Sequence, residues 1–132
     1  MTAAETLQLS WFDETRAGFE DILCEKLKQR KGPSTVLNEA IEYALLDGGK
    51  RLRAMLVFSA GHAVGTPVGE LSDAACAIEA MHAYSLVHDD LPCFDAAETR
   101  RGEPSVHRAY GERLAVLAGD ALIVAAFEVL GG

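Results

Sequence analysis

The sequence predicts an all-α protein, and three observations support this prediction. Apolar residues recur with helical spacing over several long segments, which is typical of helices that bury one face. No segment of useful length alternates apolar and polar residues with the period of two that a half-buried strand requires. Hydrophobic residues fill 49% of the 132 positions and only four are prolines, so the composition suits a folded core.

The first two expected helices are amphipathic. One covers residues 4–30 and is terminated by the segment KGPS. The other lies within TVLNEAIEYALLDGG, residues 35–49, where Gly48 or Gly49 supplies a C-terminal cap. The apolar positions that we expect to face the core are Phe12, Phe19, Ile22, Leu23 and Leu27 in the first helix and Leu37, Ile41, Ala44 and Leu45 in the second.

Three further helices follow. Residues 51–65 are apolar almost all round, which predicts a buried helix, and the segment TPVGE at 66–70 ends it. Residues 71–90 contain no glycine or proline and predict one long helix, and residues 112–130 predict another that is largely apolar. No polar closing element covers the two most apolar helices, so we expect the chain to be the first part of a larger helical domain.

Charge and cysteine content argue against several classes of protein. The formal net charge is −8 and the basic residues form no stripe, so we expect neither a nucleic-acid surface nor attachment to anionic membranes. Three widely spaced cysteines without a C-x-x-C pair predict reduced thiols rather than disulfides or zinc ligands. The first residues lack the features of a signal peptide, and no apolar run was expected to span a membrane. We therefore expect a cytoplasmic protein without membrane insertion.

The stretch SLVHDDLPCFDAAETRRGEPSVH, residues 85–107, carries the most unusual pattern. An apolar helical run ends in Asp89 and Asp90, and Asp95 follows shortly before the pair Arg100 and Arg101. A solvated salt-bridge cluster would explain these charges. A site for a polyanion that binds through a metal ion is the more specific hypothesis.

Helix geometry relates these residues to one another. His82, Ser85 and Asp89 share one helix face at about 100° per residue. Asp89 and Asp95 are six positions apart, and an undistorted helix would not align them. Pro92 removes a backbone donor between them, so we expect a bulge or a local break there. A bulge of two residues would turn an i,i+4 stack into this spacing and direct both carboxylates toward the same space.

Converging carboxylates are costly to hold together unless a cation neutralises them. Mg²⁺ prefers oxygen ligands and keeps water and phosphate oxygens in its shell, so it suits Asp89 and Asp95. Arg100 and Arg101 would then provide the bidentate donors that phosphate oxygens accept.

A second group of cations lies in the segment DGGKRLR. Lys50, Arg51 and Arg53 follow two glycines at the start of an expected helix, where backbone N–H groups and the helix dipole favour an anion. Gly-Gly-Lys alone often occurs by chance, and His82 alone fits a core histidine. Their joint presence with the aspartates in one short chain is what points to a function.

The segments GGKRLR, IEAMHAYSLVHDDLPCFD and RRGEPSVH together closely resemble short-chain trans-prenyl diphosphate synthases, and the bacterial farnesyl diphosphate synthase type in particular, over residues 35–130. The resemblance implies an isoprenoid synthase-type all-α bundle around a deep cavity, usually in a homodimer. Such enzymes join isopentenyl diphosphate to an allylic diphosphate, dimethylallyl or geranyl, to give farnesyl diphosphate. Residues 1–132 would form the N-terminal part of a single polyprenyl synthase-like domain.

The resemblance also implies roles for individual residues. Asp89 and Asp95 would bind Mg²⁺ with Asp90 in support, and Arg100 would hold the allylic diphosphate in the catalytic centre. The isopentenyl diphosphate site would consist of Lys50, Arg53, His82 and Arg101.

Chain length of the product would depend on Tyr84 and Ser85, because the family places the floor of its elongation cavity there. Ordinary core packing is the other explanation for Tyr84. The family usually continues past Asp95 with aspartates where this sequence has Ala96, Ala97 and Glu98, which reduces the negative charge around the metal.

Several alternatives remain at this point. The second aspartate-rich motif and the later lysines of the family are absent from these residues, so we expect the 132-residue chain alone to be inactive without the rest of a parent chain. A non-catalytic helical regulatory or binding subunit derived from the family is the main alternative. A terpene cyclase would not require GGKRLR or RRGEPSVH, and a metal phosphohydrolase would require further histidines beside the HDD at 88–90.

Overall fold

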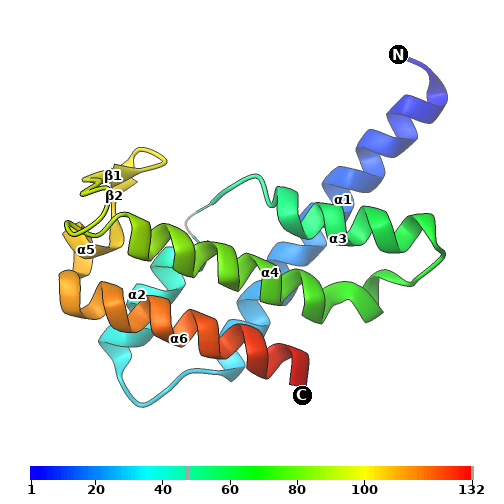
Figure 1. The fold of residues 1–132 in the computed structure, drawn as a ribbon. Helices are drawn as coiled ribbons and strands as arrows, with labels where there is room; N and C mark the ends of the chain where they lie inside the picture. Colours follow the sequence, from blue (N-terminus) through cyan, green and yellow to red (C-terminus); the bar gives the residue numbers. More distant parts are fainter. Residues whose placement is uncertain (47, 132) are drawn as a thin grey trace.

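The structure, a computed structural model, describes residues 1–46 and 48–131. The described residues form a bundle of α-helices with one short β-hairpin (Figure 1). In chain order the elements are α1 (Ala3–Gln29), α2 (Thr35–Leu46), α3 (Leu52–Ala63), α4 (Val68–Asp89), β1 (Thr99–Arg100), β2 (Glu103–Pro104), α5 (Val106–Tyr110) and α6 (Glu112–Gly131). The all-α prediction is confirmed, and every helix expected from the sequence is present.

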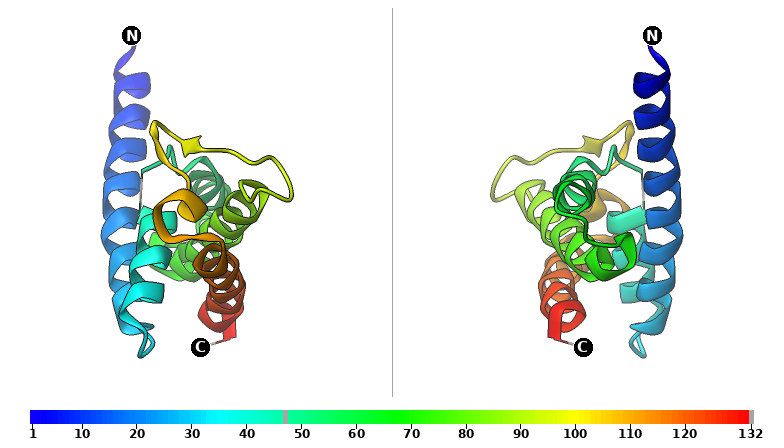
Figure 2. Two further views of the ribbon diagram at one scale, coloured as in Figure 1. Left: turned by 90° about the vertical axis from the view of Figure 1, so that its left-hand side faces the viewer. Right: turned by 90° about the vertical axis from the view of Figure 1, so that its right-hand side faces the viewer.

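Two layers of helices enclose the core. α1 and α2 form one layer, and α3, α4 and α6 form the other, with α4 packed against both α3 and α6 (Figure 2). Phe19 of α1 meets Phe58 of α3 edge to face, with ring centroids 5.6 Å apart, and Leu23 and Leu122 are buried beside them. The apolar positions expected in α1 and α2 are all buried or partly buried against this core, as predicted.

The link between α2 and α3 contains two glycines with positive φ angles. Gly48 and Gly49 have φ angles of 79° and 113°, which glycine adopts without the steric penalty of a Cβ atom. Residue 47, which the sequence analysis placed at the end of α2, lies outside the described residues.

α3 and α4 differ from the expectation in two ways. α3 was expected to be buried all round, but Leu52, Leu56 and Val64 are exposed because α3 packs mainly against α4 and α1. α4 begins at Val68, earlier than expected, with Pro67 as its N-cap residue. A proline fits there because the first N–H groups of a helix have no intrahelical acceptor.

The β-hairpin and α5 were not foreseen, because two-residue strands leave no detectable period in the sequence. β1 and β2 pair antiparallel, with Thr99 opposite Pro104. Arg101 and Gly102 form the turn with φ angles of 54° and 86°, the positive values of a two-residue type I′ turn. The hairpin therefore presents Arg101 at its tip.

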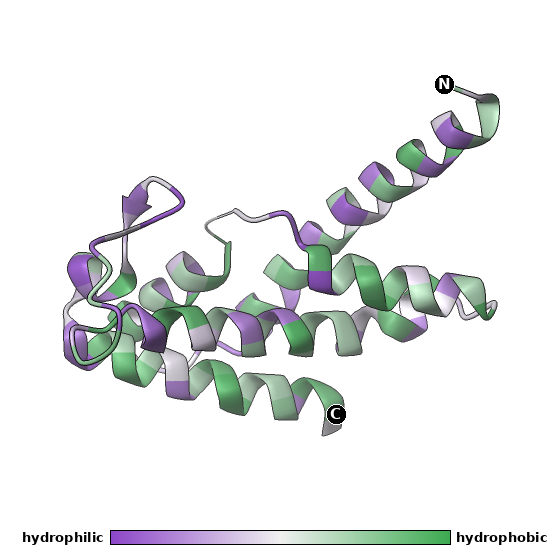
Figure 3. Cartoon of the chain, turned by 45° about the horizontal axis from the view of Figure 1, so that its top comes forward, coloured by the Kyte–Doolittle hydropathy of each residue, from purple (hydrophilic) through white to green (hydrophobic). Residues whose placement is uncertain are grey.

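α6 is more apolar than the sequence analysis allowed for. It is long and apolar enough to cross a membrane by length and composition alone, so the expectation that no run reaches this length is wrong. Its ribbon is hydrophobic along most of its length (Figure 3). α6 also packs against α4, α2 and α5, as a core helix of a bundle does.

α4 and α6 approach closely where Gly119 faces His88. A Cβ atom built at Gly119 would lie 2.1 Å from the Nε2 atom of His88, so only glycine leaves room for the ring. The same Nε2 atom lies 3.1 Å from the carbonyl oxygen of Val116. This contact fixes α6 against the last turn of α4, immediately before Asp89.

Replacing Gly119 with Ala should therefore lower the melting temperature, because the added methyl group would displace the His88 ring. Overpacking of this kind costs about 1–3 kcal/mol. Gly18→Ala is the matched control, since nothing lies within 4 Å of a Cβ atom built there and alanine favours a helix. Calorimetric melting of the three proteins gives the comparison. Equal melting temperatures for wild type and Gly119→Ala would contradict the close contact.

Candidate functional site

The aspartate segment folds back onto the end of α4. The helix ends at Asp89, and the backbone N–H of Asp95 donates to the Asp89 carbonyl over 2.9 Å. The N–H of Ala97 donates to the carbonyl of Asp90 over 3.1 Å. The local break expected around Pro92 is confirmed, and it brings the backbones of Asp89 and Asp95 together although they are six residues apart.

The carboxylates of Asp89 and Asp95 interact with Arg100 through their charges, which help to raise its pKa. Both residues are exposed, and within the described ranges neither carboxylate has a hydrogen bond or an ion pair. Residues 1–46 and 48–131 contain no preformed group of three or more metal-ligating side chains. Two free carboxylates fit Mg²⁺, because this ion is usually held by one or two carboxylates while water and phosphate oxygens complete its shell.

Asp90 has a different role from its neighbour. Its side chain is 3% exposed, and it accepts hydrogen bonds from Nε of Arg100 at 2.7 Å and Nη2 at 2.6 Å. These hydrogen bonds to Asp90 raise the pKa of Arg100. A guanidinium has five N–H groups, so this pairing fixes one edge of Arg100 and leaves donors for a further anion.

Polar residues that the sequence analysis did not single out hold the following loop. Ser105 Oγ donates to the carbonyl of Ala97 over 2.7 Å, and Nε2 of His107 lies 2.8 Å from the same oxygen. Tyr43 of α2 donates from its hydroxyl to the carbonyl of Pro104 over 2.7 Å. Ser105 and His107 belong to the segment RRGEPSVH, but their burial depends on tertiary packing that the residue pattern does not reveal.

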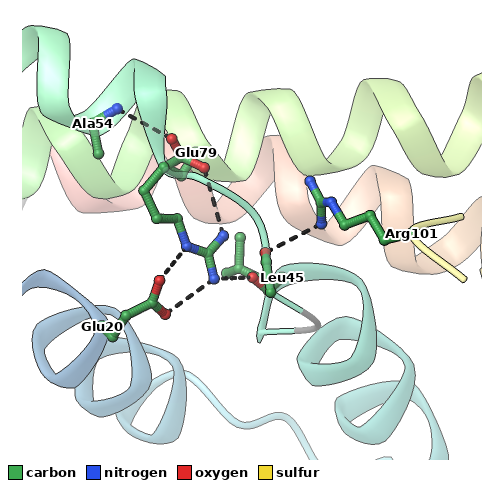
Figure 4. Close-up of polar contacts among 7 residues, drawn as sticks. Glu20, Leu45, Ala54, Glu79 and Arg101 are labelled. Atoms are coloured by element: carbon green, nitrogen blue, oxygen red, sulfur yellow. Dashed lines mark hydrogen bonds and ion pairs between the residues drawn. The ribbon is translucent and has the colours of Figure 1, made fainter. Parts of the chain in front are cut away.

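The hairpin tip meets the glycine loop before α3. Nη1 of Arg101 donates to the carbonyl of Gly48 over 3.2 Å (Figure 4). A Cβ atom built at Gly49 would lie 3.0 Å from Nη2 of Arg101, so the two segments are in close contact. Arg101 is thereby brought to the loop that carries Lys50, as the implied isopentenyl diphosphate site requires.

His82 lies among the cations of this region. Burial lowers its pKa from the ordinary value of 6.5, and the positive charges of Arg53, Arg101 and Arg100 lower it further, while the charge of Glu79 acts in the opposite direction. The lowered pKa favours the neutral form of His82 near pH 7. We use the name cationic cluster for Lys50, Arg53, His82 and Arg101. The charges of Arg53 and Arg101 act on the His82 ring, and Lys50 directly follows the glycines that Arg101 contacts.

Arg51 does not belong to this cluster, although the sequence placed it beside Lys50. Its guanidinium is buried between Glu20 and Glu79 (Figure 4). Glu79 also accepts a hydrogen bond from the backbone N–H of Ala54 over 3.1 Å in the first turn of α3. The anion expected at the start of this helix is thus, at this N–H group, the protein's own carboxylate.

Tyr84 and Ser85 occupy the turn of α4 that precedes the aspartates. The Tyr84 ring packs edge to face against His88, with centroids 5.7 Å apart, and is partly buried against the core. Ser85 donates its hydroxyl hydrogen bond to the carbonyl of His82 over 2.7 Å. Core packing accounts for Tyr84 as it stands here, and a local hydrogen bond accounts for Ser85.

Comparison with known proteins decides the family. Residues 34–132 match the model of the polyprenyl synthetase family. The chain belongs to this family. It is 58% identical over 95 residues to a geranylgeranyl diphosphate synthase of Cereibacter sphaeroides, covering 71% of this chain and 33% of that protein. It is 53% identical over 93 residues to a chloroplastic geranylgeranyl pyrophosphate synthase of Capsicum annuum, covering 70% of this chain and 25% of that protein.

Solved structures confirm the isoprenoid synthase-type fold. The geranyltransferase of Legionella pneumophila superposes with a TM-score of 0.93 at 38% identity, covering 96% of this chain and 45% of that one. The geranyltranstransferase of Thermotoga maritima gives a TM-score of 0.85 at 42% identity, covering 91% of this chain and 44% of that one. The chain thus spans less than half of these relatives, and the resemblance to prenyl diphosphate synthases is confirmed at the level of the family.

The environment of His82 gives a testable prediction. Its imidazole should titrate below pH 6.5 in the free protein, because burial and the neighbouring arginines oppose protonation. A lowered folded-state pKa also means that stability falls as the pH decreases below about 6.5. NMR titration measures the midpoint, and the signal lost in His82→Gln gives the assignment. A His82 midpoint above 6.5 would contradict the crowding of cations around this ring.

Proposed function

We propose that this chain provides the aspartate wall and the isopentenyl diphosphate cluster of a prenyltransferase. The enzyme condenses isopentenyl diphosphate with dimethylallyl or geranyl diphosphate. The proposal rests on one observation, which is that three features belong to segments joined at the aspartate end of α4. They are the exposed carboxylates of Asp89 and Asp95, the Arg100 guanidinium held by Asp90, and Arg101 at the glycine loop. Membership in the polyprenyl synthetase family supports the same reaction class.

The allylic diphosphate would bind at the aspartate end of α4. Asp89 and Asp95 would hold Mg²⁺, which supplies positive charge to a diphosphate leaving group when it is bound. Arg100 would direct its unused N–H groups to the diphosphate oxygens, because Asp90 already fixes the other edge. As the C–O bond breaks, its electron pair leaves with the diphosphate, and the guanidinium stabilises the charge that develops there.

Isopentenyl diphosphate would bind in the cationic cluster. Lys50, Arg53 and Arg101 are exposed and would neutralise its diphosphate, while the neutral His82 can donate one hydrogen bond. The double bond of this substrate then attacks the allylic cation and forms the new C–C bond. The proton lost from the adjacent carbon passes to the released diphosphate, which leaves the product neutral at the reacting carbons.

Farnesyl diphosphate is the product that we propose. The geranyl-transfer names of the two solved structures agree with it, because a ten-carbon geranyl group joined to isopentenyl diphosphate gives fifteen carbons, whereas the other two relatives carry geranylgeranyl names. The partly buried ring of Tyr84 is the feature that supports a short product, because it occupies the turn of α4 before the metal-binding carboxylates. Ser85 lies on the same turn. The homodimer, the single-domain assignment of residues 1–132 and the cytoplasmic location also remain predictions.

Removal of either free carboxylate should abolish efficient turnover. Asp89→Ala or Asp95→Ala in the full-length protein should reduce prenyl transfer at limiting Mg²⁺ by at least about a hundredfold, the scale of a lost charge-stabilising group. Asp21→Ala is the control, because Asp21 is an exposed aspartate on α1. Steady-state assays with dimethylallyl and isopentenyl diphosphates provide the rates. Normal turnover by Asp89→Ala would refute the metal assignment.

Shortening Tyr84 should lengthen the product. Tyr84→Ala leaves a void of ring size, and a void of this kind can accept more prenyl chain. Tyr84→Phe keeps the ring and should retain the wild-type product. Chromatography of the dephosphorylated products distinguishes the two variants. If Tyr84→Ala forms nothing longer than wild type does, the cavity floor is elsewhere.

A further inference from the structure

We propose that Arg51, buried between Glu20 and Glu79, is a positioning residue for the isopentenyl diphosphate site. The role rests on the proposed function, because it acts through Lys50 and Arg53, which are assigned to that site. Arg51 would not touch the substrate, since its side chain is only 3% exposed.

The guanidinium of Arg51 connects three helices. Its Nε atom donates to Glu20 of α1 over 2.5 Å, and Nη2 donates to the same carboxylate over 3.1 Å. Nη2 also donates to the carbonyl of Leu45 in α2 over 2.8 Å. Nη1 lies 3.6 Å from Glu79 of α4. A planar fork is required for these contacts, and a lysine could not make all of them at once.

Glu79 extends this network to the helix that carries Arg53. Its other carboxylate oxygen accepts the N–H of Ala54, the residue directly after Arg53. The first turn of α3 is therefore tied to α4, and through Arg51 to α1 and α2 (Figure 4). Glu79 and Arg51 together determine where α3 begins relative to His82, which lies one turn after Glu79 on α4.

The backbone conformation of Arg51 explains why the side chains of Lys50 and Arg53 remain available to bind an anion. Arg51 has φ 52° and ψ 32°, a left-handed conformation that residues other than glycine rarely adopt. The buried side-chain contacts hold this conformation in place. Lys50 before it and Arg53 after it are exposed, so their charged groups can meet an anion while the side chain of Arg51 is buried.

Arg51 also balances charge close to the site. The negative charge of Glu79 reaches His82, where it opposes the effect of the arginines. Without Arg51, the carboxylates of Glu20 and Glu79 would stand uncompensated near the cationic cluster and would weaken its attraction for a diphosphate. The position and the charge of Arg51 therefore act in the same direction on binding.

A purely structural role is the competing explanation, because removing one partner of a buried ion pair strongly destabilises a fold. The two roles differ in which ligand they affect. Loss of a positioning residue weakens isopentenyl diphosphate selectively, whereas general destabilisation lowers the melting temperature and affects both ligands alike. Phe19→Leu is the matched control, since it perturbs the packing of α1 against α3 through Phe58 and has no polar link to the glycine loop.

Calorimetric titration of the full-length protein, well below its melting temperature, tests the proposal. Isopentenyl diphosphate is one ligand, and a thio analogue of dimethylallyl diphosphate with Mg²⁺ is the other. Arg51→Gln should weaken the first by about tenfold or more, because misplaced binding groups lose much of their effect, and should leave the second within about twofold. Arg51→Lys should lie between wild type and Arg51→Gln, and Phe19→Leu should change neither affinity.

The outcomes separate this proposal from the proposed function. Unchanged isopentenyl diphosphate affinity in Arg51→Gln, or an equal loss for both ligands, would overturn the positioning role and leave the reaction untouched. A wild-type protein that binds isopentenyl diphosphate but forms no prenyl product would overturn the reaction alone. A wild-type protein that does not bind isopentenyl diphosphate would overturn both.

Discussion

The ion pair between Asp90 and Arg100 is the interaction on which the aspartate end of the bundle depends. It closes the loop between α4 and the β-hairpin over distances of 2.7 and 2.6 Å, with the Asp90 side chain almost completely buried. A carboxylate buried without its partner costs on the order of 3–5 kcal/mol. The pair therefore holds the loop, sets one edge of Arg100, and leaves Asp89 free at the end of the helix. The two adjacent aspartates thus differ in their surroundings, since Asp90 is buried and paired whereas Asp89 is exposed.

The β-hairpin links the aspartate end of α4 to the proposed isopentenyl diphosphate site. Its tip residue, Arg101, reaches the carbonyl of Gly48, so the loop closed by Asp90 and Arg100 also meets the segment that carries Lys50. Beneath that segment, Arg51 and Glu79 tie the start of α3 to the neighbouring helices. The two anion sites that we propose are therefore each supported by an ion pair with a buried carboxylate, Asp90 with Arg100 and Glu79 with Arg51. A diphosphate site needs positive charge at its surface, and the buried carboxylates are the groups that hold the arginines in place.

Much of this arrangement could be predicted from the sequence, and the remainder depends on tertiary contacts. Helical spacing located the long helices, and Pro92 indicated the break that brings Asp89 and Asp95 together. The hairpin was not predicted, because strands of two residues are too short to show an alternating pattern of apolar and polar residues. In the sequence, Glu20 and Glu79 are ordinary charged positions of helices, because no neighbouring residues indicate that Arg51 is buried between them. The two most apolar helices, α3 and α6, were expected to lack a cover, but which of their apolar residues are exposed depends on tertiary packing that composition does not reveal.

The central claim is that Asp89 and Asp95 bind the metal while Asp90 holds Arg100. One structure would test this claim most directly. A crystal structure of the full-length protein with Mg²⁺ and a thio analogue of dimethylallyl diphosphate would show which oxygen atoms bind the metal. We expect metal ligands from Asp89 and Asp95, while Asp90 remains paired with Arg100 and the free edge of Arg100 contacts the diphosphate. A metal bound by Asp90, with Arg100 released from it, would contradict the claim.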